Sequence, residues 1–299
     1  MTPSPEHEQF VAALAAGGSV LTPTDPPTPE ALQELRALEA AGGFTQPAGT
    51  TVTSTRYGGV DCLRLDGSGR GRTAIYFHGG GYVYTRAADA LGAIAAMAKR
   101  CNLQMVAPDY RRAPEFPFPT AVDDAVAVYR ALLADGVPNT DIVVAGDSAG
   151  GGLALACMLA ARRSGLPVPA AGILFSPWTD LAVEGPSADA ADDPVVNGGG
   201  LRMMANAYLS GGDARNPLAS PLYASDDEIA VLPTLLIQVG TRESLLDDSR
   251  RFVTRAKASG ADVEYIEYPG VVHMWMVMAP DLPESLYAFD ATADFLSRL

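Results

Sequence analysis

The sequence predicts an α/β protein with a mostly parallel sheet of eight strands and helices on both faces. Short apolar segments alternate with helical patterns from residue 73 to the C-terminus, which is typical of a sheet covered by helices on both sides. Two segments with strand-like composition, at 51–57 and 60–65, flank Gly58-Gly59 and predict an antiparallel hairpin. The 299 residues suffice to bury one large core or two smaller ones.

The predicted helices and strands follow one another along the chain. Residues 1–48 contain two helical patterns, HEQFVAALAA and PEALQELRALEAAG, on either side of the Pro-rich LTPTDPPTP, whose last proline suits a helix start. The strands after the hairpin are expected at 73–78, 104–108, 141–146, 171–177, 234–240 and 263–269. Helices are expected at 87–100, 120–136, 151–165, 245–260 and 284–299.

Residues 180–232 interrupt this alternation. They contain one helical pattern, LRMMANAYLSGG, and are too long for a plain connection between two elements. We therefore expect an inserted subdomain, and the two N-terminal helices, which have no strand partner, could pack beside it.

Composition narrows the possible partners and location. The net charge of -14 argues against nucleic-acid binding, because phosphate contacts require clustered Lys and Arg. No segment is apolar over the length of a membrane span, and the N-terminus lacks the basic start of a signal peptide. The three cysteines are odd in number and lack close metal-ligand spacing, which predicts a reducing, cytoplasmic environment and no metal site.

Ser148 is the candidate nucleophile. The residues Gly146-Asp147-Ser148-Ala149-Gly150 fit the pattern G-x-S-x-G and lie between a predicted strand and a predicted helix, the context that this motif requires. A serine on such a tight turn holds strained backbone angles, and neighbours without a Cβ atom make room for it. The alternative, a flexible loop, does not explain this strand-turn-helix context.

A serine hydroxyl needs a base, and the chain offers three histidines. His7 lies in the first helical pattern, where we expect it to be solvated. His273 follows the last strand, at the edge where open α/β sheets collect their active sites, and it is the candidate base. His78 opens a glycine run at a strand end, and we expect it to order that loop by hydrogen bonding.

The glycine run suggests an oxyanion hole. Successive glycines at 79–81 let backbone amides converge on one oxygen without side chains in the way. Together with the amide of Ala149, the amides of Gly79, Gly80 and Gly81 are expected to stabilise the oxyanion of acyl transfer. The alternative, a Gly-rich hairpin, does not explain the position at the end of a strand.

The carboxylate that orients the histidine has three candidates. Glu243 lies just beyond the strand at 234–240, whereas Asp247 and Asp248 lie in or near the first turn of the next helix, where a carboxylate is often simply a cap. The chain order of Ser148, Glu243 and His273 is the order expected on this sheet architecture. We favour Glu243 and keep both aspartates as alternatives.

From about residue 50 to the C-terminus, the sequence resembles the hormone-sensitive-lipase-like (family IV) bacterial carboxylesterases, which have the α/β-hydrolase fold. The motifs that carry the resemblance are HGGGY (78–82), DYRRAPEFPFPTAVDDA (109–125), GDSAGG (146–151), SPWTDL (176–181), SPLYA (220–224), GTRESLLDD (240–248) and PGVVHMW (269–275). The resemblance implies a catalytic core at 49–179 and 233–299, and a helical cap built from residues 1–48 and 180–232.

The resemblance also implies chemistry: a serine esterase for small, short-acyl-chain esters, with no cofactor, and a homodimer. Ser148 and His273 take the family's roles of nucleophile and base, and Gly79 to Gly81 with Ala149 take that of the oxyanion region. The family most often has Asp where this chain has Glu243, so the extra methylene requires a withdrawn backbone or a shifted histidine.

The remaining expectations concern the substrate and the rival functions. Tyr82, Trp178, Met203 and Tyr208 are candidate substrate contacts, and ordinary packing of the cap is the alternative for each. One rival function is a non-catalytic ligand-binding protein on the same fold, which would be expected to lose the serine or the histidine. The other is an amidase or dehydratase that uses the same site.

Overall fold

The computed structural model describes residues 2–17, 28–42, 46–66 and 71–299, which form one eight-stranded sheet in the order β1-β2-β4-β3-β5-β6-β7-β8. The strands are β1 (Val52–Tyr57), β2 (Val60–Leu65), β3 (Thr73–Phe77), β4 (Gln104–Pro108), β5 (Ile142–Asp147), β6 (Ala171–Phe175), β7 (Thr234–Arg242) and β8 (Val263–Val272). Strand β2 is antiparallel to β1 and β4, and all other neighbouring pairs are parallel. The predicted α/β fold with a mostly parallel sheet of eight strands is confirmed.

The helices follow the predicted alternation. The α-helices are α1 (Pro5–Gly17), α2 (Pro29–Gly42), α3 (Leu91–Arg100), α4 (Thr120–Ala134), α5 (Ala149–Arg163), α6 (Ser187–Ala190), α7 (Gly198–Leu209), α8 (Asp226–Ala230), α9 (Leu246–Ala258), α10 (Trp275–Met278) and α11 (Pro283–Ser297). The 3₁₀-helices are η1 (Ala87–Ala90), η2 (Asn139–Asp141) and η3 (Pro221–Tyr223). The short helices α6, α8 and α10 are not predicted from the sequence, because four or five residues are too few to display a helical period.

Helix α7 illustrates how a helix can start earlier than its apolar pattern. Helix α7 begins at Gly198, three residues before the predicted start at 201. The side chain of Asn197 accepts a hydrogen bond from the amide of Gly200, which satisfies one of the amides left open at a helix N-terminus.

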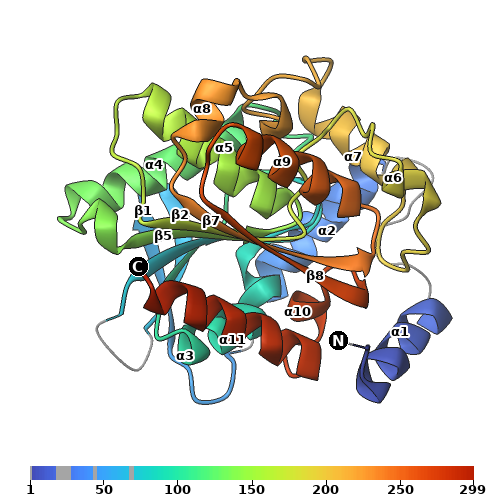
Figure 1. The fold of residues 1–299 in the computed structure, drawn as a ribbon. Helices are drawn as coiled ribbons and strands as arrows, with labels where there is room; N and C mark the ends of the chain where they lie inside the picture. Colours follow the sequence, from blue (N-terminus) through green and yellow to red (C-terminus); the bar gives the residue numbers. More distant parts are fainter. Residues whose placement is uncertain (1, 18–27, 43–45, 67–70) are drawn as a thin grey trace.

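The sheet separates two hydrophobic cores. Helices α4, α5 and α9 cover one face, and α3 and α11 cover the other (Figure 1). On β5, Val144 packs into the first core, whereas Val143 and Ala145 pack into the second, and all three are fully buried. Burial on both faces explains the unbroken apolar run of this strand.

The N-terminal helices attach at separate places. Helix α1 contacts α11, where the carboxylate of Glu284 accepts hydrogen bonds from the amide and the hydroxyl of Ser4, at 2.6 and 3.0 Å. From α2, Arg36 donates to the carbonyl oxygens of Val83 and Ala113. Most of the Pro-rich stretch predicted between these helices lies outside the described residues, and the division into cap and core stays a prediction.

The expectation of a solvated His7 is wrong. The side chain is buried in α1, and within the described part of the chain neither ring nitrogen has a hydrogen-bond partner. Burial therefore lowers the pKa of His7, although the charges of Glu284 and Glu8 oppose the shift. Helix packing, which the local sequence does not reveal, decides the environment of this residue.

Candidate active site

Ser148 lies on a strained turn between β5 and α5. Its backbone angles are φ 52° and ψ -122°, a region that side-chain-bearing residues rarely adopt. A Cβ atom on Gly146 would lie 2.3 Å from the carbonyl oxygen of Gly150, and one on Gly150 would lie 2.0 Å from that of Phe77. Only glycine fits at both positions, so the glycines that flank Ser148 are a steric requirement of the turn.

Three residues distant in sequence form a hydrogen-bonded chain at the carboxyl edge of the sheet. The Oγ atom of Ser148 lies 3.0 Å from Nε2 of His273, and Nδ1 of His273 lies 3.1 Å from Oε1 of Glu243. All three side chains are buried. Because a carboxylate only accepts, the neutral imidazole carries its proton on Nδ1 and presents Nε2 to the serine hydroxyl.

Glu243 is fixed by two further donors. Its Oε2 atom accepts a hydrogen bond from Oγ of Ser176 at 2.6 Å and from the amide of Gly240 at 2.9 Å. The pairing of β7 with β8 is irregular between Gly240 and Arg242, and such irregularities re-aim nearby side chains. Both oxygens of this carboxylate are therefore engaged, one toward the histidine and one toward the sheet.

The environment of His273 favours its protonated form. Burial is the largest single effect and would lower its pKa, but the charge and hydrogen bond of Glu243, together with the charges of Asp193 and Asp147, outweigh it. The pKa of His273 is therefore raised above its usual value of 6.5. A base of this kind accepts the proton of the neighbouring hydroxyl readily when the hydroxyl oxygen acts as a nucleophile.

The two aspartates considered as alternatives have other partners. Asp247 accepts a hydrogen bond from the amide of Ser187 at 2.7 Å. Asp248 is buried and accepts from the amides of Thr179 and Asp180, at 2.7 and 2.8 Å. Burial raises the pKa of Asp248 to about 8, helped by the charge of Asp180. The carboxylate within hydrogen-bond distance of His273 is that of Glu243.

The glycine loop offers fewer free amides than its three glycines suggest. The amide of Gly79 donates to Oδ1 of Asp147 at 3.1 Å, so it is directed away from any oxyanion. Within the described chain, the amides of Gly80 and Gly81 have no acceptor, and Ala149 is the first residue of α5, whose amide has no partner inside the helix. The available donors are thus Gly80, Gly81 and Ala149.

His78 and Asp147 anchor the glycine loop at 79–81 through ring stacking and hydrogen bonds. The ring of His78 stacks on that of Tyr110, with ring centres 4.2 Å apart, and its Nδ1 lies 3.2 Å from Oγ1 of Thr85. Asp147 also accepts from the hydroxyl of Tyr76 at 2.8 Å. Burial raises the pKa of Asp147 to about 6, against these hydrogen bonds. The stacking of His78 on Tyr110 and its contact with Thr85 are what we expect of a residue that orders the loop.

A cavity of about 270 Å³ adjoins the site. It is lined by His78, Gly79, Thr85, Asp89, Ala90, Val195, Met274, Val277 and Met278. Ser148 and His273 are not part of this lining, but Gly79 packs directly against the nucleophile turn, since a Cβ atom on it would lie 3.2 Å from Cβ of Ser148. On the opposite side, Met274 directly follows the histidine of the hydrogen-bonded chain.

Three of the four residues predicted as substrate contacts pack against one another. Tyr82 stacks on Tyr208, with ring centres 3.9 Å apart, and the ring centre of Trp178 lies 6.2 Å from that of Tyr82. Together with Met203, these side chains are at most 9% exposed and do not line the cavity beside Met274. Their packing explains their burial without a ligand, and contact with a substrate stays a prediction.

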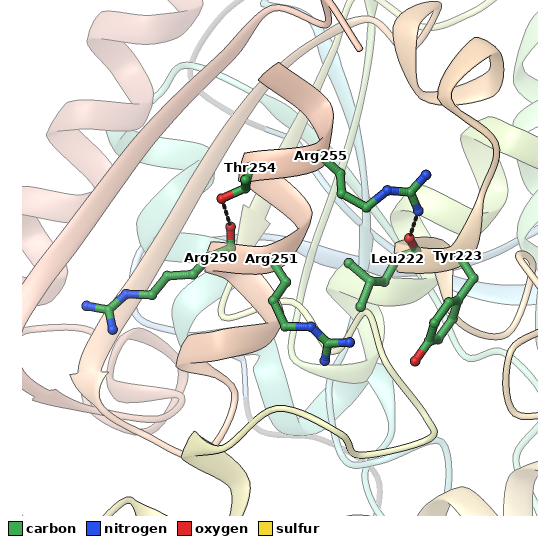
Figure 2. A pocket seen from close by; sticks show the side chains of 6 residues that line it. All are labelled: Leu222, Tyr223, Arg250, Arg251, Thr254 and Arg255. Carbon is green, nitrogen blue, oxygen red and sulfur yellow. Dashed lines mark hydrogen bonds between the residues drawn. The ribbon is translucent and has the colours of Figure 1, made fainter. Parts of the chain in front are cut away.

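A larger hollow of about 400 Å³ lies against α9 and η3, with Arg250, Arg251 and Arg255 in its wall (Figure 2). Arg250 pairs with Glu267, Arg251 with Asp180, and Arg255 with Asp226. The guanidinium of Arg255 also donates to the carbonyl oxygen of Leu222 (Figure 2). These arginines are neutralised by neighbouring carboxylates, so the hollow is no anion site, and it contains none of the residues of the hydrogen-bonded chain.

Three contributors to the site are missed by the sequence reasoning. Ser176 and Asp147 lie inside motifs that are noted but receive no role, although each is polar at the end of a buried strand, which is a usable signal. Asp193, which influences His273, lies in the inserted region. No local pattern indicates that it approaches the site.

Among the described residues, no cluster of three His, Cys, Asp or Glu side chains could hold a metal ion. The three cysteines are free, and burial raises the pKa of each thiol to about 12. In the same part of the chain, no helix combines the length and apolarity needed to cross a membrane.

Comparison with known proteins places the chain in a family. Residues 74–277 match the family described as alpha/beta hydrolase fold. An acetyl-hydrolase of Streptomyces hygroscopicus is 42% identical over 265 residues, covering 87% of this chain and 86% of that protein. An esterase of Acinetobacter venetianus is 32% identical over 228 residues, covering 75% and 74%.

Solved structures of esterases are similar to this chain along its length. A crystal structure of an esterase from the bacterial hormone-sensitive lipase family has a TM-score of 0.88 at 36% identity, covering 100% of this chain and 99% of that one. A hormone-sensitive lipase from a metagenome library has a TM-score of 0.86, also at 36% identity, with 98% of each chain covered. The chain belongs to the α/β-hydrolase family and, within it, to the hormone-sensitive-lipase branch of esterases.

Proposed function

We propose that the protein is a serine carboxylester hydrolase that acts through an acyl-enzyme. The observation that carries this proposal is the hydrogen-bonded chain from Ser148 Oγ through His273 to Glu243, with distances of 3.0 and 3.1 Å. A nucleophile, a base and an orienting acid in this arrangement are the parts that acyl transfer needs.

In the first half-reaction, Ser148 attacks the ester carbonyl while Nε2 of His273 takes the hydroxyl proton. The resulting imidazolium is stabilised by Glu243, and it returns the proton to the alcohol as the ester bond breaks. Water then attacks the acyl-enzyme, with the same imidazole as its base, and the acid leaves as Ser148 is regenerated.

The oxyanion is stabilised by the amides of Gly80, Gly81 and Ala149. Because Gly79 donates to Asp147, we assign Gly79 the task of anchoring the loop to the nucleophile turn. The N-terminus of α5 points its amides toward the same oxygen. Loss of one such donor typically reduces the rate by about 10²–10³-fold.

The substrate is a small ester with a short acyl chain. The cavity of about 270 Å³ is smaller than the typical pocket for a drug-sized ligand, which supports a small substrate. One relative is named acetyl-hydrolase, and crystals of the structural neighbour EstE5 were soaked with p-nitrophenyl butyrate. The segment 180–232 and the N-terminal helices would form the cap, with Val195 in the cavity wall.

The test combines labelling with turnover. An organophosphonate should modify Ser148, as located by mass spectrometry, and Ser148→Ala should lower kcat for p-nitrophenyl acetate by at least about 10³-fold. The rates with p-nitrophenyl esters should fall as the acyl chain lengthens. A label on another residue, or undiminished turnover by Ser148→Ala, would refute the mechanism, and faster cleavage of matched anilides would make the protein an amidase.

A further inference from the structure

The turn that carries Glu243 is bound by a segment of the inserted region. We call residues 242–247 the acid turn. Ser244, the residue after Glu243, has its amide, its carbonyl and its hydroxyl all bonded to residues 187–196. Its amide donates to Oδ2 of Asp193 at 2.9 Å, its hydroxyl donates to the carbonyl oxygen of Val196 at 2.7 Å, and its carbonyl accepts from Oγ of Ser187 at 2.8 Å.

Asp193 contributes the charged member of these contacts. Its second oxygen, Oδ1, accepts a hydrogen bond from the amide of Val195 at 2.8 Å, so both carboxylate oxygens are held by backbone amides. Val195 in turn lines the cavity beside Met274. One side chain therefore connects the wall of the cavity to the turn that presents Glu243.

Asp193 also acts on the base through its charge. The carboxylates that face His273 are those of Glu243 at the end of β7, Asp147 at the end of β5, and Asp193. Of these, Glu243 is hydrogen-bonded to the ring, and Asp193 is the one supplied by the inserted region. Burial raises the pKa of Asp193 to about 6, against the charge of His273 and the two amide hydrogen bonds.

We propose that Asp193 is a positioning residue for the triad, which fixes the acid turn against the inserted region. This inference rests on the proposed esterase mechanism. The side chain of Glu243 is one methylene longer than that of Asp, and a turn fixed on three backbone or hydroxyl groups of Ser244 defines where this longer side chain starts. The inserted region would then set the geometry of the acid as well as the size of the substrate site.

The test compares Asp193→Asn with Asp213→Asn. Asp213 accepts a bond from the amide two residues later, as Asp193 does, but it is exposed in another loop. With p-nitrophenyl acetate, and with active sites counted by organophosphonate titration, Asp193→Asn should lower kcat about tenfold, with KM changed less than twofold. Asp213→Asn should leave both constants unchanged.

The pH profile provides a readout that a merely structural role would not move. Asp193→Asn removes a negative charge that raises the pKa of His273, so the acid limb of kcat/KM should move to lower pH by ~0.5 unit. An unchanged kcat per titrated site together with an unmoved acid limb would overturn the proposal. If Asp193→Asn gives no titratable protein, Asp193→Glu decides, because it keeps the charge and changes the reach: a reduced kcat with a wild-type acid limb supports the proposal, and a wild-type kcat overturns it.

Failure of this inference can be told from failure of the proposed function. Ser148→Ala is assayed in parallel. If Ser148→Ala is inactive while Asp193→Asn behaves as wild type, the esterase mechanism stands and the role of Asp193 is wrong. If Ser148→Ala retains turnover, the mechanism itself fails, whatever the result at Asp193.

Discussion

The two ends of the proposed triad are held in different ways. The nucleophile turn is fixed by residues 146–150 and by the backbone of β3, through close contacts that only glycine permits. The acid turn is fixed by side chains 51 to 67 positions away in sequence, from Asp193, Ser187 and Ser176. The first is a steric device encoded by the glycines of one short segment, and the second depends on hydrogen bonds from the side chains of several distant segments. The same catalytic unit thus combines one part that tolerates few substitutions with another that depends on distant partners.

Among changes at the acid turn, loss of the carboxylate of Glu243 should give the largest effect. Glu243→Gln keeps the size of the side chain but loses the charge that stabilises the imidazolium. We expect kcat for p-nitrophenyl acetate to fall about 10²–10⁴-fold. Asp247→Asn is the control. Asp247 bonds the amide of Ser187 instead of His273, so the control should lower kcat at most about tenfold. If the control lost orders of magnitude while Glu243→Gln did not, the acid would be misassigned.

The nucleophile turn can be disrupted by a substitution at Gly150. In Gly150→Ala the new methyl group would lie 2.0 Å from the carbonyl oxygen of Phe77, so the turn or β3 must shift. We expect kcat to fall about 10–100-fold and Tm to fall by several degrees, since overpacking of this kind costs about 1–3 kcal/mol.

Gly92→Ala provides the control for this substitution. Gly92 lies in α3, and the nearest atom to its added Cβ would be 3.6 Å away, an ordinary contact. This variant should keep full activity and the same or a higher Tm. Equal behaviour of the two variants would show that the close approach at Gly150 has no consequence for the nucleophile turn.

A smaller effect is expected where a single long-range hydrogen bond is lost. Ser176→Ala removes the hydroxyl that lies 2.6 Å from Oε2 of Glu243, while the amide of Gly240 still holds the same oxygen. Hydrogen bonds to charged groups contribute about 1.5–3 kcal/mol, so we expect kcat to fall about tenfold with KM nearly unchanged. A wild-type kcat would mean that Gly240 alone suffices to orient the acid.

The pH dependence sharpens the comparison without any mutation. His273 must be neutral to act as a base, and its pKa is raised above 6.5. Activity is therefore lost as the pH falls through that raised value, and the midpoint of the acid limb of kcat/KM should lie above pH 6.5. In Glu243→Gln the residual activity should show a midpoint at lower pH. A wild-type midpoint below 6.5 would contradict the electrostatic description of this site.

The sequence predicts the strands and the nucleophile turn well because each has its signature in a few consecutive residues. Apolar runs such as that of β5 report burial on both faces, and the glycines around Ser148 report close contacts of the turn, with itself and with Phe77 of β3. The amide of Gly79 illustrates the limit of this approach. Its sequence position suggests an oxyanion donor, whereas in the structure Asp147, 68 positions later, accepts its hydrogen bond. Glycine runs reveal freedom of the backbone, but they do not reveal which amides stay free.

Long-range burial accounts for the other differences. His7 belongs to a helical pattern, and only the docking of α1 near α11 shows that its ring is buried. Asp193 and Ser187 lie in a region without strong periodicity, so neither their elements nor their contacts can be anticipated. The predicted substrate contacts Tyr82 and Tyr208 stack on each other, so the packing of these two aromatic rings accounts for their burial.

The triple attachment of Ser244 bears on protein engineering. Exchanging the inserted region between relatives is an obvious way to alter which esters are accepted. Here a graft with borders at 180 and 232 would also replace the side chains that bond the residue after Glu243. Chimeras should therefore transplant 187–196 and 242–247 as one cassette, and a graft of the inserted region alone would change selectivity and turnover at once.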